Sequence, residues 1–351
     1  MFNFRNISSI RYSALDFTER GWYNLRNDKE HRKMKIRHDI HTHTLFSTCC
    51  EDPEATMAAF VREAHELGHK VIGISNHLWD EKVAGASYWY FLQPIKYGLE
   101  AKYAIPADTK GVKVLFGIES EFCGMSDTLG LLAETAKQFD YVLIPHSHTH
   151  MKNFVIPDDS DVKAARETVR ERLAAAFPEL SSDLIGRMSG CLGRVDLIPS
   201  IKQPEIDYAQ YLADFMHDSF DKLLAHPEFV KLSNTVPTLV AHPFAVCGES
   251  TEISQASKRK LDRDRLFEQF RKAAKMNVAM DVNISAYTPI NGSYENDEMV
   301  KVMRIARDAG CKFAFGTDSH SVAGLKEIRH GDELSEIIGI TENDLIDIVK
   351  A

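Results

Sequence analysis

Residues 36–40 read Ile-Arg-His-Asp-Ile, a short strand pattern, and residues 71–75 read Val-Ile-Gly-Ile-Ser, a second one. A helical pattern with one apolar face lies between them. Asp52 suits the N-cap of this helix, Pro53 suits its first turn, and Gly68 suits its end. A strand, a helix and a strand in this order predict a βαβ unit, whose two strands run parallel.

The same alternation of short apolar runs and helical patterns continues along the chain, which predicts an α/β barrel with a parallel sheet. The expected strands are Ile36–Ile40, Val71–Ser75, Val112–Ile118, Tyr141–Pro145, Thr238–Ala241, Val278–Ile284 and Lys312–Gly316. The expected helices after the first βαβ unit are Leu129–Gln138, Asp161–Phe177, Tyr208–Ala225, Leu261–Met276, Asp297–Ala309 and Glu342–Lys350.

One barrel accounts for most of the 351 residues, because α/β barrels reach this size as single domains. Residues 1–35 show no sustained period and are interpreted as an N-terminal extension, and residues 36–351 as the barrel. The segment from about 151 to 236, between the fourth and fifth strands, is longer than such a connection needs. It predicts a helical cap inserted over a pocket.

Composition narrows the class of protein. Hydrophobic residues make up 44% and charged residues 26% of the chain, as in a globular protein with a large core. The net charge of -9 disfavours nucleic-acid binding through a basic face. No apolar run reaches the roughly 18 residues of a membrane span, and residues 1–6 do not lead into a signal peptide, so we expect a cytoplasmic protein. The oligomeric state stays open.

The residues after the first strand suggest a metal site. Asp39, His41 and His43 alternate along the strand, so their side chains point the same way. Two imidazoles on one side are the donors that a metal ion needs. Asp39 could orient one of these imidazoles as a supporting carboxylate.

Other metal-competent side chains recur where the predicted strands end. The carboxyl ends of barrel strands form the active-site face, so these side chains should meet in one pocket. His226 has sequence neighbours similar to those of His242, but it follows a helical pattern, which favours His242. The strand-end residues are His77, Glu119, His146, His148, His242, Asp318 and His320.

The mixture of donors indicates which ions can bind. Imidazoles and carboxylates without a dominant set of thiolates suit Zn²⁺, Mn²⁺ or Fe²⁺. Because these ligands are too many for one ion, the sequence predicts two or three divalent ions, with Glu119 as a bridging carboxylate. Such clusters activate water and stabilise phosphoryl charge during in-line displacement.

In their order and spacing these motifs resemble those of the polymerase and histidinol phosphatase (PHP) family. The resemblance runs from about Ile36 to His320 and includes Asp-Ile-His-Thr-His at residues 39–43, Gly-Ile-Glu ending at Glu119, and Gly-Thr-Asp-Ser-His at residues 316–320. It implies a distorted (β/α)7 TIM-like barrel, the PHP fold, with a site for three metal ions.

The resemblance also implies how the residues share the ions. One ion would be held by His41, His43, Glu119 and Asp318. A second would be held by Glu119, His242 and either His148 or His146. A third would be held by His77 and His320. Cys49 stands where the family often has a histidine of the third site, and its thiolate can bind zinc.

The implied activity is hydrolysis of a small-molecule phosphomonoester, as in histidinol phosphatases, through attack by a metal-bridging hydroxide. Glu119, Asp318 and His320 are the expected catalytic residues. Two alternatives are an amidohydrolase and a non-catalytic metal-binding PHP module. Residues that can contact the substrate, or else serve only as surface charge or a structural amide, are Lys152, Arg187, Arg194 and Asn283.

Overall fold

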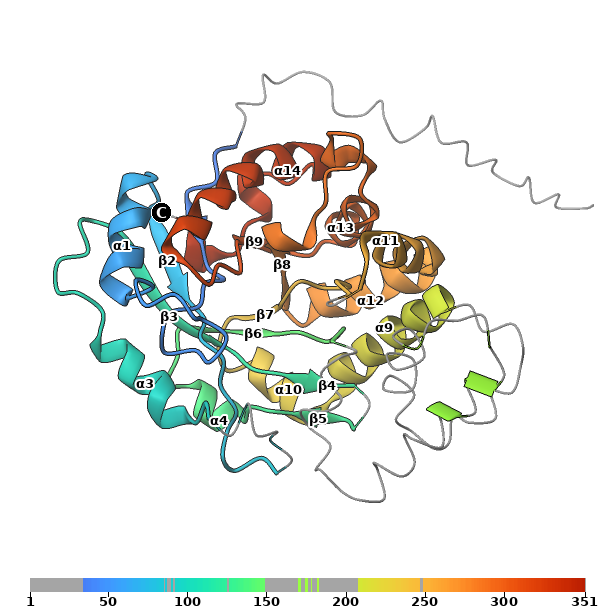
Figure 1. Ribbon diagram of the computed structural model, residues 1–351, viewed down its shortest axis with the longest axis horizontal. Helices are drawn as coiled ribbons and strands as arrows, with labels where there is room; N and C mark the ends of the chain where they lie inside the picture. Colours follow the sequence, from blue (N-terminus) through green and yellow to red (C-terminus); the bar gives the residue numbers. More distant parts are fainter. Residues whose placement is uncertain are drawn as a thin grey trace, which may run out of the picture. The chain divides into compact units, whose positions relative to one another are not determined.

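The computed structural model describes residues 34–84, 86, 90, 92–124, 126–148, 208–246 and 249–350, with single positions at 170, 171, 174, 175, 178 and 182 (Figure 1). The expected N-terminal extension therefore lies outside the described residues, except for Met34 and Lys35. Among the described helices, none has the length and apolar character that crossing a membrane requires.

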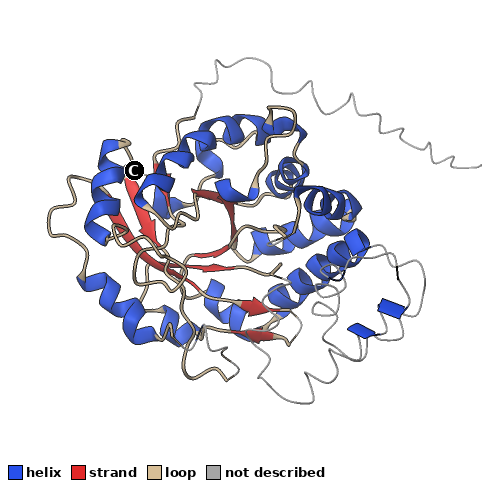
Figure 2. Cartoon of the chain, viewed as in Figure 1, coloured by secondary structure: helices blue, strands red, loops and turns tan. Residues whose placement is uncertain are grey.

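Seven parallel strands form the central sheet, in the order β1-β2-β3-β6-β7-β8-β9. The first and last strands meet, since the Ile40 amide donates to the Phe315 carbonyl (3.1 Å) and the His43 amide to the Ser319 carbonyl (2.8 Å). The sheet thus closes into the barrel that the sequence predicts, with helices around it (Figure 2). The strands are β1 His38–Asp39, β2 Val71–Ile74, β3 Lys113–Glu119, β6 Tyr141–Ile144, β7 Thr238–Val240, β8 Ala279–Asn283 and β9 Phe313–Gly316.

All seven strand predictions are confirmed, and a short hairpin of β4 Phe122–Cys123 and β5 Thr128–Leu129 was not predicted. The helices predicted at 208–225, 261–276 and 297–309 are also confirmed. The helix predicted at Leu129–Gln138 is mostly wrong, because Leu129 pairs with Phe122 in the hairpin and only Ala133–Ala136 is helical. The α-helices are α1 Met57–Glu66, α3 Ile95–Tyr103, α4 Ala133–Ala136, α9 Tyr208–Ala225, α10 Pro227–Ser233, α11 Thr251–Lys260, α12 Arg263–Lys275, α13 Glu298–Asp308 and α14 His330–Ile338.

The predicted start of the first helix is wrong by one turn. Thr56, not Asp52, is the N-cap of α1, and its hydroxyl accepts a hydrogen bond from the Ala59 amide at 3.2 Å. The Asp52 carboxylate instead accepts from the Glu54 amide at 2.9 Å. Asp52 therefore forms a local turn, for which its short side chain is equally suited.

The predicted C-terminal helix at 342–350 is also wrong. Two 3-10 turns lie there, η6 Glu342–Asp344 and η7 Asp347–Val349. Between them the Ile346 amide donates to the Phe313 carbonyl at 2.9 Å, and Leu345 bridges to Phe313. Pairing with β9 takes the backbone groups that a continuous helix would use.

The end of the long insertion belongs to the helical layer of the barrel. Helix α9 packs against α11 and α12, and α10 packs against α4 (Figure 1). Phe220 of α9 makes edge contacts with the rings of Phe244 and Phe270. From Tyr208 onward the segment is therefore part of the barrel wall. The first part of the predicted cap, residues 151–207 with the helix Asp161–Phe177, lies outside the described residues apart from the single positions named above.

Tyr141 fills the space between the first three strands. Its hydroxyl donates to the Ile40 carbonyl at 2.5 Å, and its ring lies against Gly117 of β3. Gly73 of β2 faces the same hydroxyl. The two glycines leave room for the ring, so β1, β2 and β3 pack closely below the carboxyl ends that carry the candidate site.

Candidate metal centre

The carboxyl ends of the barrel strands place most of the predicted donor residues in one cluster, whose members are buried or partly buried. Parallel strands make this possible because all their carboxyl ends open on one face. The residues are His41 and His43 after β1, His77 after β2, Glu119 at the end of β3, His148 after β6, His242 after β7, and Asp318 and His320 after β9.

Four of these side chains form a first donor group, with ligand atoms within 4.8 Å of one another: His41, His43, Glu119 and Asp318. His43 Nε2 lies 3.3 Å from Glu119 Oε2 and 3.0 Å from Asp318 Oδ1. His41 Nε2 lies 3.1 Å and 3.4 Å from the same two oxygens. Two imidazole nitrogens and two carboxylate oxygens thus face one point, as the ligands of a cation do.

The two carboxylate oxygens of Glu119 face different histidines. Oε2 faces His41 and His43, whereas Oε1 lies 3.2 Å from His242 Nε2. The side chain is almost completely buried, with 1% exposure of the residue. A carboxylate held in this way can bind one ion through each oxygen.

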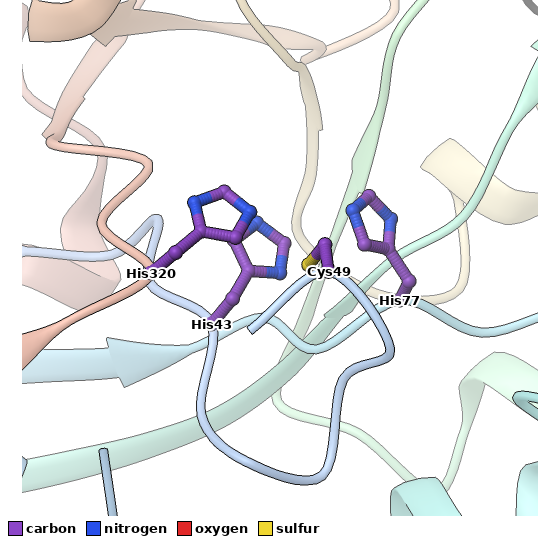
Figure 3. Close-up of side chains that lie close together, drawn as sticks. All are labelled: His43, Cys49, His77 and His320. Atoms are coloured by element: carbon purple, nitrogen blue, oxygen red, sulfur yellow. The ribbon is translucent and has the colours of Figure 1, made fainter. Parts of the chain in front are cut away.

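A second donor group shares His43 with the first and adds a sulfur. Its members are His43, Cys49, His77 and His320, again within 4.8 Å of one another. Cys49 lies between the ring of His77 and the rings of His43 and His320 (Figure 3). The His43 ring stacks on both other rings, with centroid distances of 4.5 Å to His77 and 4.6 Å to His320.

The structure places His148, and not His146, beside the cluster. The His148 ring stacks on His242 at a centroid distance of 4.7 Å. His146 packs instead between Phe220 and Phe244, and its Nε2 accepts a hydrogen bond from the Phe244 amide at 3.2 Å. This nitrogen already has a partner in the hydrophobic core, so the geometry favours His148 as a ligand.

Two candidate ligands adopt a backbone conformation that non-glycine residues rarely use. His242 has φ of 28° and Asp318 has φ of 55°. Such conformations cost free energy and persist where the surrounding structure imposes them, often at functional sites. Here they turn the chain sharply after β7 and β9, with the two side chains directed to the cluster.

Asp281 is a supporting residue that the sequence analysis missed. Its Oδ2 lies 2.7 Å from His41 Nδ1 and accepts a hydrogen bond from the His242 amide at 3.3 Å. The proposal that Asp39 orients an imidazole is wrong, because Asp39 accepts from the Thr317 hydroxyl (2.7 Å) and from backbone amides. The sequence did contain a signal for Asp281. This residue lies two positions before Asn283 on β8, so the two side chains point to the same side of the strand.

Glu121 is a second buried carboxylate that was not predicted. Its Oε2 lies 3.0 Å from His148 Nδ1 and accepts a hydrogen bond from the Tyr90 hydroxyl at 3.3 Å. Burial, together with the nearby Glu119 charge, raises the pKa of Glu121 well above its ordinary value. The residue lies two positions after Glu119, and this spacing was the signal that could have identified it.

Opposite charges dominate the electrostatics of the first donor group. Burial alone would raise the pKa of Glu119, but His41 and His77 lower it well below the usual value. Burial likewise opposes ionisation of Asp318, and His41 and His43 lower its pKa. The pocket therefore stabilises two carboxylate anions, which are strong ligands for a divalent cation.

The donor residues fit the divalent ions that the sequence predicts. Both ring nitrogens of His43 are buried, and among the described residues neither has a hydrogen bond of good geometry, although Nε2 lies close to two carboxylates. Buried polar atoms are normally satisfied, so such atoms point to a missing partner. A divalent cation would satisfy the histidine and neutralise the carboxylates together.

The predicted substrate residues separate into two groups. Asn283 lies at the cluster, where its Nδ2 donates to Asp318 Oδ2 at 3.3 Å and its Oδ1 accepts from the Ser285 amide at 3.0 Å. It thus positions Asp318 and caps a short 3-10 turn. Lys152, Arg187 and Arg194 lie outside the described residues.

A cavity of about 330 Å³ opens beside the cluster. His242 and Asp318 form part of its wall, so a molecule in it would contact the proposed ligands. A larger cavity of about 620 Å³ lies at the amino ends of β7 and β8, and its described lining contains no histidine or cysteine. The other residues around the smaller cavity are Ala245, Val246, Glu249, Thr251, Ser254, Lys258, Ser285, Ala286 and Thr288.

The comparison with protein families identifies a family for this chain. A family model described as PHP domain matches residues 39–224, from β1 into α9. No curated protein sequence matches the chain. A solved structure, the histidinol phosphate phosphatase of Lactococcus lactis complexed with zinc, L-histidinol and phosphate, is 16% identical, covers 88% of this chain and 95% of its own, and has a TM-score of 0.42.

Proposed function

The chain belongs to the PHP domain family, and on this premise we propose that it is a metal-dependent phosphoesterase that hydrolyses a small-molecule phosphomonoester. The observation that carries the proposal is the position of Glu119 between two sets of imidazoles, with one oxygen directed to each. A bridging carboxylate between two ions is the arrangement that two-metal hydrolases need.

The proposed ligands follow from the two sides of Glu119. His41, His43 and Asp318 would complete one ion position, and His242 with His148 would complete the other. When bound, ions at these positions would lower the pKa of a water molecule and neutralise charge on the phosphoryl oxygens. We propose two or three divalent ions, of Zn²⁺, Mn²⁺ or Fe²⁺, as part of the same function.

Asp318 has the geometry to move the proton of the attacking water. Its Oδ1 faces His41 and His43, its Oδ2 accepts from Asn283, and the residue is part of the wall of the 330 Å³ cavity. Its side chain is 22% exposed, so the substrate can approach it. Oδ2 is therefore the proposed proton acceptor.

His320 is better suited to bind a metal than to transfer a proton. Its Nδ1 lies 2.8 Å from the Asp318 carbonyl oxygen, which can only accept a hydrogen bond, so Nδ1 carries the proton. Nε2 is then the nitrogen that remains for a metal ion. Of the three expected catalytic residues, Glu119 and Asp318 keep direct roles in the proposed reaction, and His320 supports it as a ligand.

The substrate class can be tested with the purified protein and a panel of compounds. Phosphomonoesters, including histidinol phosphate, phosphodiesters and amides would each be offered with Mn²⁺, Zn²⁺ or Fe²⁺. Metal-dependent release of phosphate from a monoester is the expected result. Turnover of amides alone would replace the proposal with an amidohydrolase, and metal binding without any turnover would favour a non-catalytic module.

Replacing Glu119 by Ala should lower metal content and phosphatase activity together, because the variant loses the carboxylate that serves two ion positions. Metal analysis of the purified variant and an activity assay measure the two effects. Glu134→Ala is the matched control, since Glu134 is an exposed glutamate paired with Lys137 on the surface. A Glu119→Ala protein that retains the wild-type metal content would refute the bridging role.

A further inference from the structure

Cys49 introduces a sulfur atom into a cluster that otherwise offers nitrogen and oxygen. The residue lies in the loop between β1 and α1, and its ligand atom is within 4.8 Å of ligand atoms of three histidines (Figure 3). Its thiol also lies 3.3 Å from the Ser47 hydroxyl. This arrangement is more than a single cysteine near a pocket, because three imidazoles surround the same sulfur.

His43 is a member of both donor groups. The ligands that remain for an ion at the Cys49 sulfur therefore depend on which group His43 serves. Its Nε2 lies 3.0 Å from an Asp318 oxygen and 3.3 Å from a Glu119 oxygen, which associates it with the oxygen-containing group. The sulfur group then keeps Cys49, His77 and His320. Three protein ligands with a fourth position open are the arrangement of many reactive zinc sites.

The neighbouring ion positions therefore differ in chemical character. The group with Glu119 and Asp318 combines imidazoles with two carboxylates, a set that accepts Mn²⁺ and Fe²⁺ as well as Zn²⁺. The group with Cys49 combines imidazoles with a soft thiolate. Thiolates favour Zn²⁺ over Mn²⁺, which is the weakest binder among the divalent ions of its series.

We propose that Cys49 makes its position selective for zinc, so that the centre can hold two kinds of metal ion. This inference rests on the proposed function, which requires a centre with more than one ion. Zinc occupies the position of Cys49, His77 and His320. The carboxylate position next to it accepts a harder ion such as Mn²⁺. Which ion occupies each position then depends on the ligands at that position and not only on the supply of metal.

The neighbouring cysteine offers a matched control. The Cys50 thiol donates to the His320 carbonyl oxygen at 3.0 Å and belongs to neither donor group of the described residues. Cys49 and Cys50 are neighbours in the same loop, and both are partly buried. A substitution at Cys50 therefore removes a thiol from the same loop without removing the proposed ligand.

Cobalt can report directly on the sulfur ligand. The full-length protein would be freed of metal, refilled with Co²⁺, and examined for the near-ultraviolet charge-transfer absorption that a thiolate gives when it binds cobalt. We expect this band in the wild type and in Cys50→Ser, and its loss in Cys49→Ser. A wild-type protein that binds cobalt without the band, or a Cys49→Ser protein that keeps it, would overturn the assignment.

The selectivity of the Cys49 position for zinc is tested in a separate competition between metal ions. Wild-type protein and Cys49→His would be equilibrated with Zn²⁺ in a large excess of Mn²⁺, and their metal content measured. The wild type should retain about one zinc ion per chain, whereas Cys49→His, which keeps three donors, should exchange more of its zinc for manganese. Equal retention of zinc by both proteins would contradict the proposal.

Both measurements are independent of turnover, so this inference and the proposed function can fail separately. The cobalt band without phosphatase activity would leave the zinc assignment intact and remove the phosphoesterase. Metal-dependent phosphatase activity without the band would support the phosphoesterase and remove the zinc assignment.

Discussion

Single residues next to the candidate metal centre differ in which groups they hold in place. Asp281 contacts the ring of His41, and so fixes which nitrogen of that ring faces Glu119. Asp39 contacts Thr317 and the His41 amide, and so joins the ends of β1 and β9. Two aspartates of similar burial therefore have separate roles, one at a candidate ligand and one at the closure of the barrel.

Replacing Asp281 by Asn should weaken metal binding by roughly 10- to 100-fold, the usual cost of losing a carboxylate that supports a ligand imidazole. Titration of metal-free protein with zinc measures the change. The control is Asp140→Asn, since Asp140 accepts a hydrogen bond from the Phe116 amide at the start of β6. Equal zinc affinities in the Asp281 and Asp140 variants would show that Asp281 does not act through His41.

Substitutions of His146 and His148 should have different effects. His148→Ala should lower metal content with little loss of stability, because the ring lies against His242 and Glu121 at the cluster. His146→Ala should keep the metal and lower the free energy of unfolding by about 2 kcal/mol or more, because it leaves a gap between Phe220 and Phe244. Metal analysis and urea unfolding distinguish the two, and the reverse pattern would transfer the ligand role to His146.

At the scale of secondary structure, the first strands of the barrel depend on small residues at particular positions. Tyr141 reaches from β6 across β3 to the Ile40 carbonyl, and it does so over Gly117 and beside Gly73. A methyl group at either glycine would collide with the tyrosine or with Ile40. The packing of these strands in turn sets the distance between His41 and Glu119.

Replacing Gly117 by Ala should destabilise the protein by about 1–3 kcal/mol, since the added methyl group overlaps the Tyr141 ring. Urea unfolding measures this loss. In a Tyr141→Val background the same glycine substitution should cost less, because the ring that it strikes is absent. Equal costs in both backgrounds would show that Gly117 acts through the backbone and not through contact with Tyr141.

For the whole molecule, two buried histidines outside the candidate metal centre couple stability to pH. Burial, with a contribution from His69, lowers the pKa of His38 to about 3, and burial lowers the pKa of His69 to about 4. His38 must stay neutral in the fold, because its Nε2 accepts a hydrogen bond from the Phe315 amide. Below its ordinary pKa of about 6.5 the unfolded chain therefore binds protons that the folded chain does not.

This difference predicts that stability falls as pH decreases from about 6.5 toward 3, by up to about 1.4 kcal/mol per pH unit for each such histidine, and that these groups contribute no slope above this window. His38→Gln keeps an acceptor for the Phe315 amide but does not titrate. Its stability should decline less steeply than that of the wild type in denaturant titrations at several pH values. His65→Gln, at an exposed position, should follow the wild type, and a His38→Gln slope equal to the wild-type slope would contradict the prediction.

The chain order of local patterns was enough to predict the architecture and most of the candidate donors. Strand and helix signals depend on near neighbours, which is why all seven strands and the bounds of α9 were predicted correctly. The parallel arrangement then implied that residues such as Glu119 and Asp318 would meet at one face. These inferences need only periodicity and the direction of the strands.

The pairing of distant side chains was decided by tertiary structure alone. Asp281 reaches His41 across 240 positions of sequence, a contact that depends on the closed barrel. His146 and His148 have the same parity along the chain, so strand alternation cannot distinguish them. The irregular backbone after β6 directs His148 to His242 and leaves His146 among aromatic rings. Local sequence does not encode such directions, because they arise from the packing of each strand end against its neighbours.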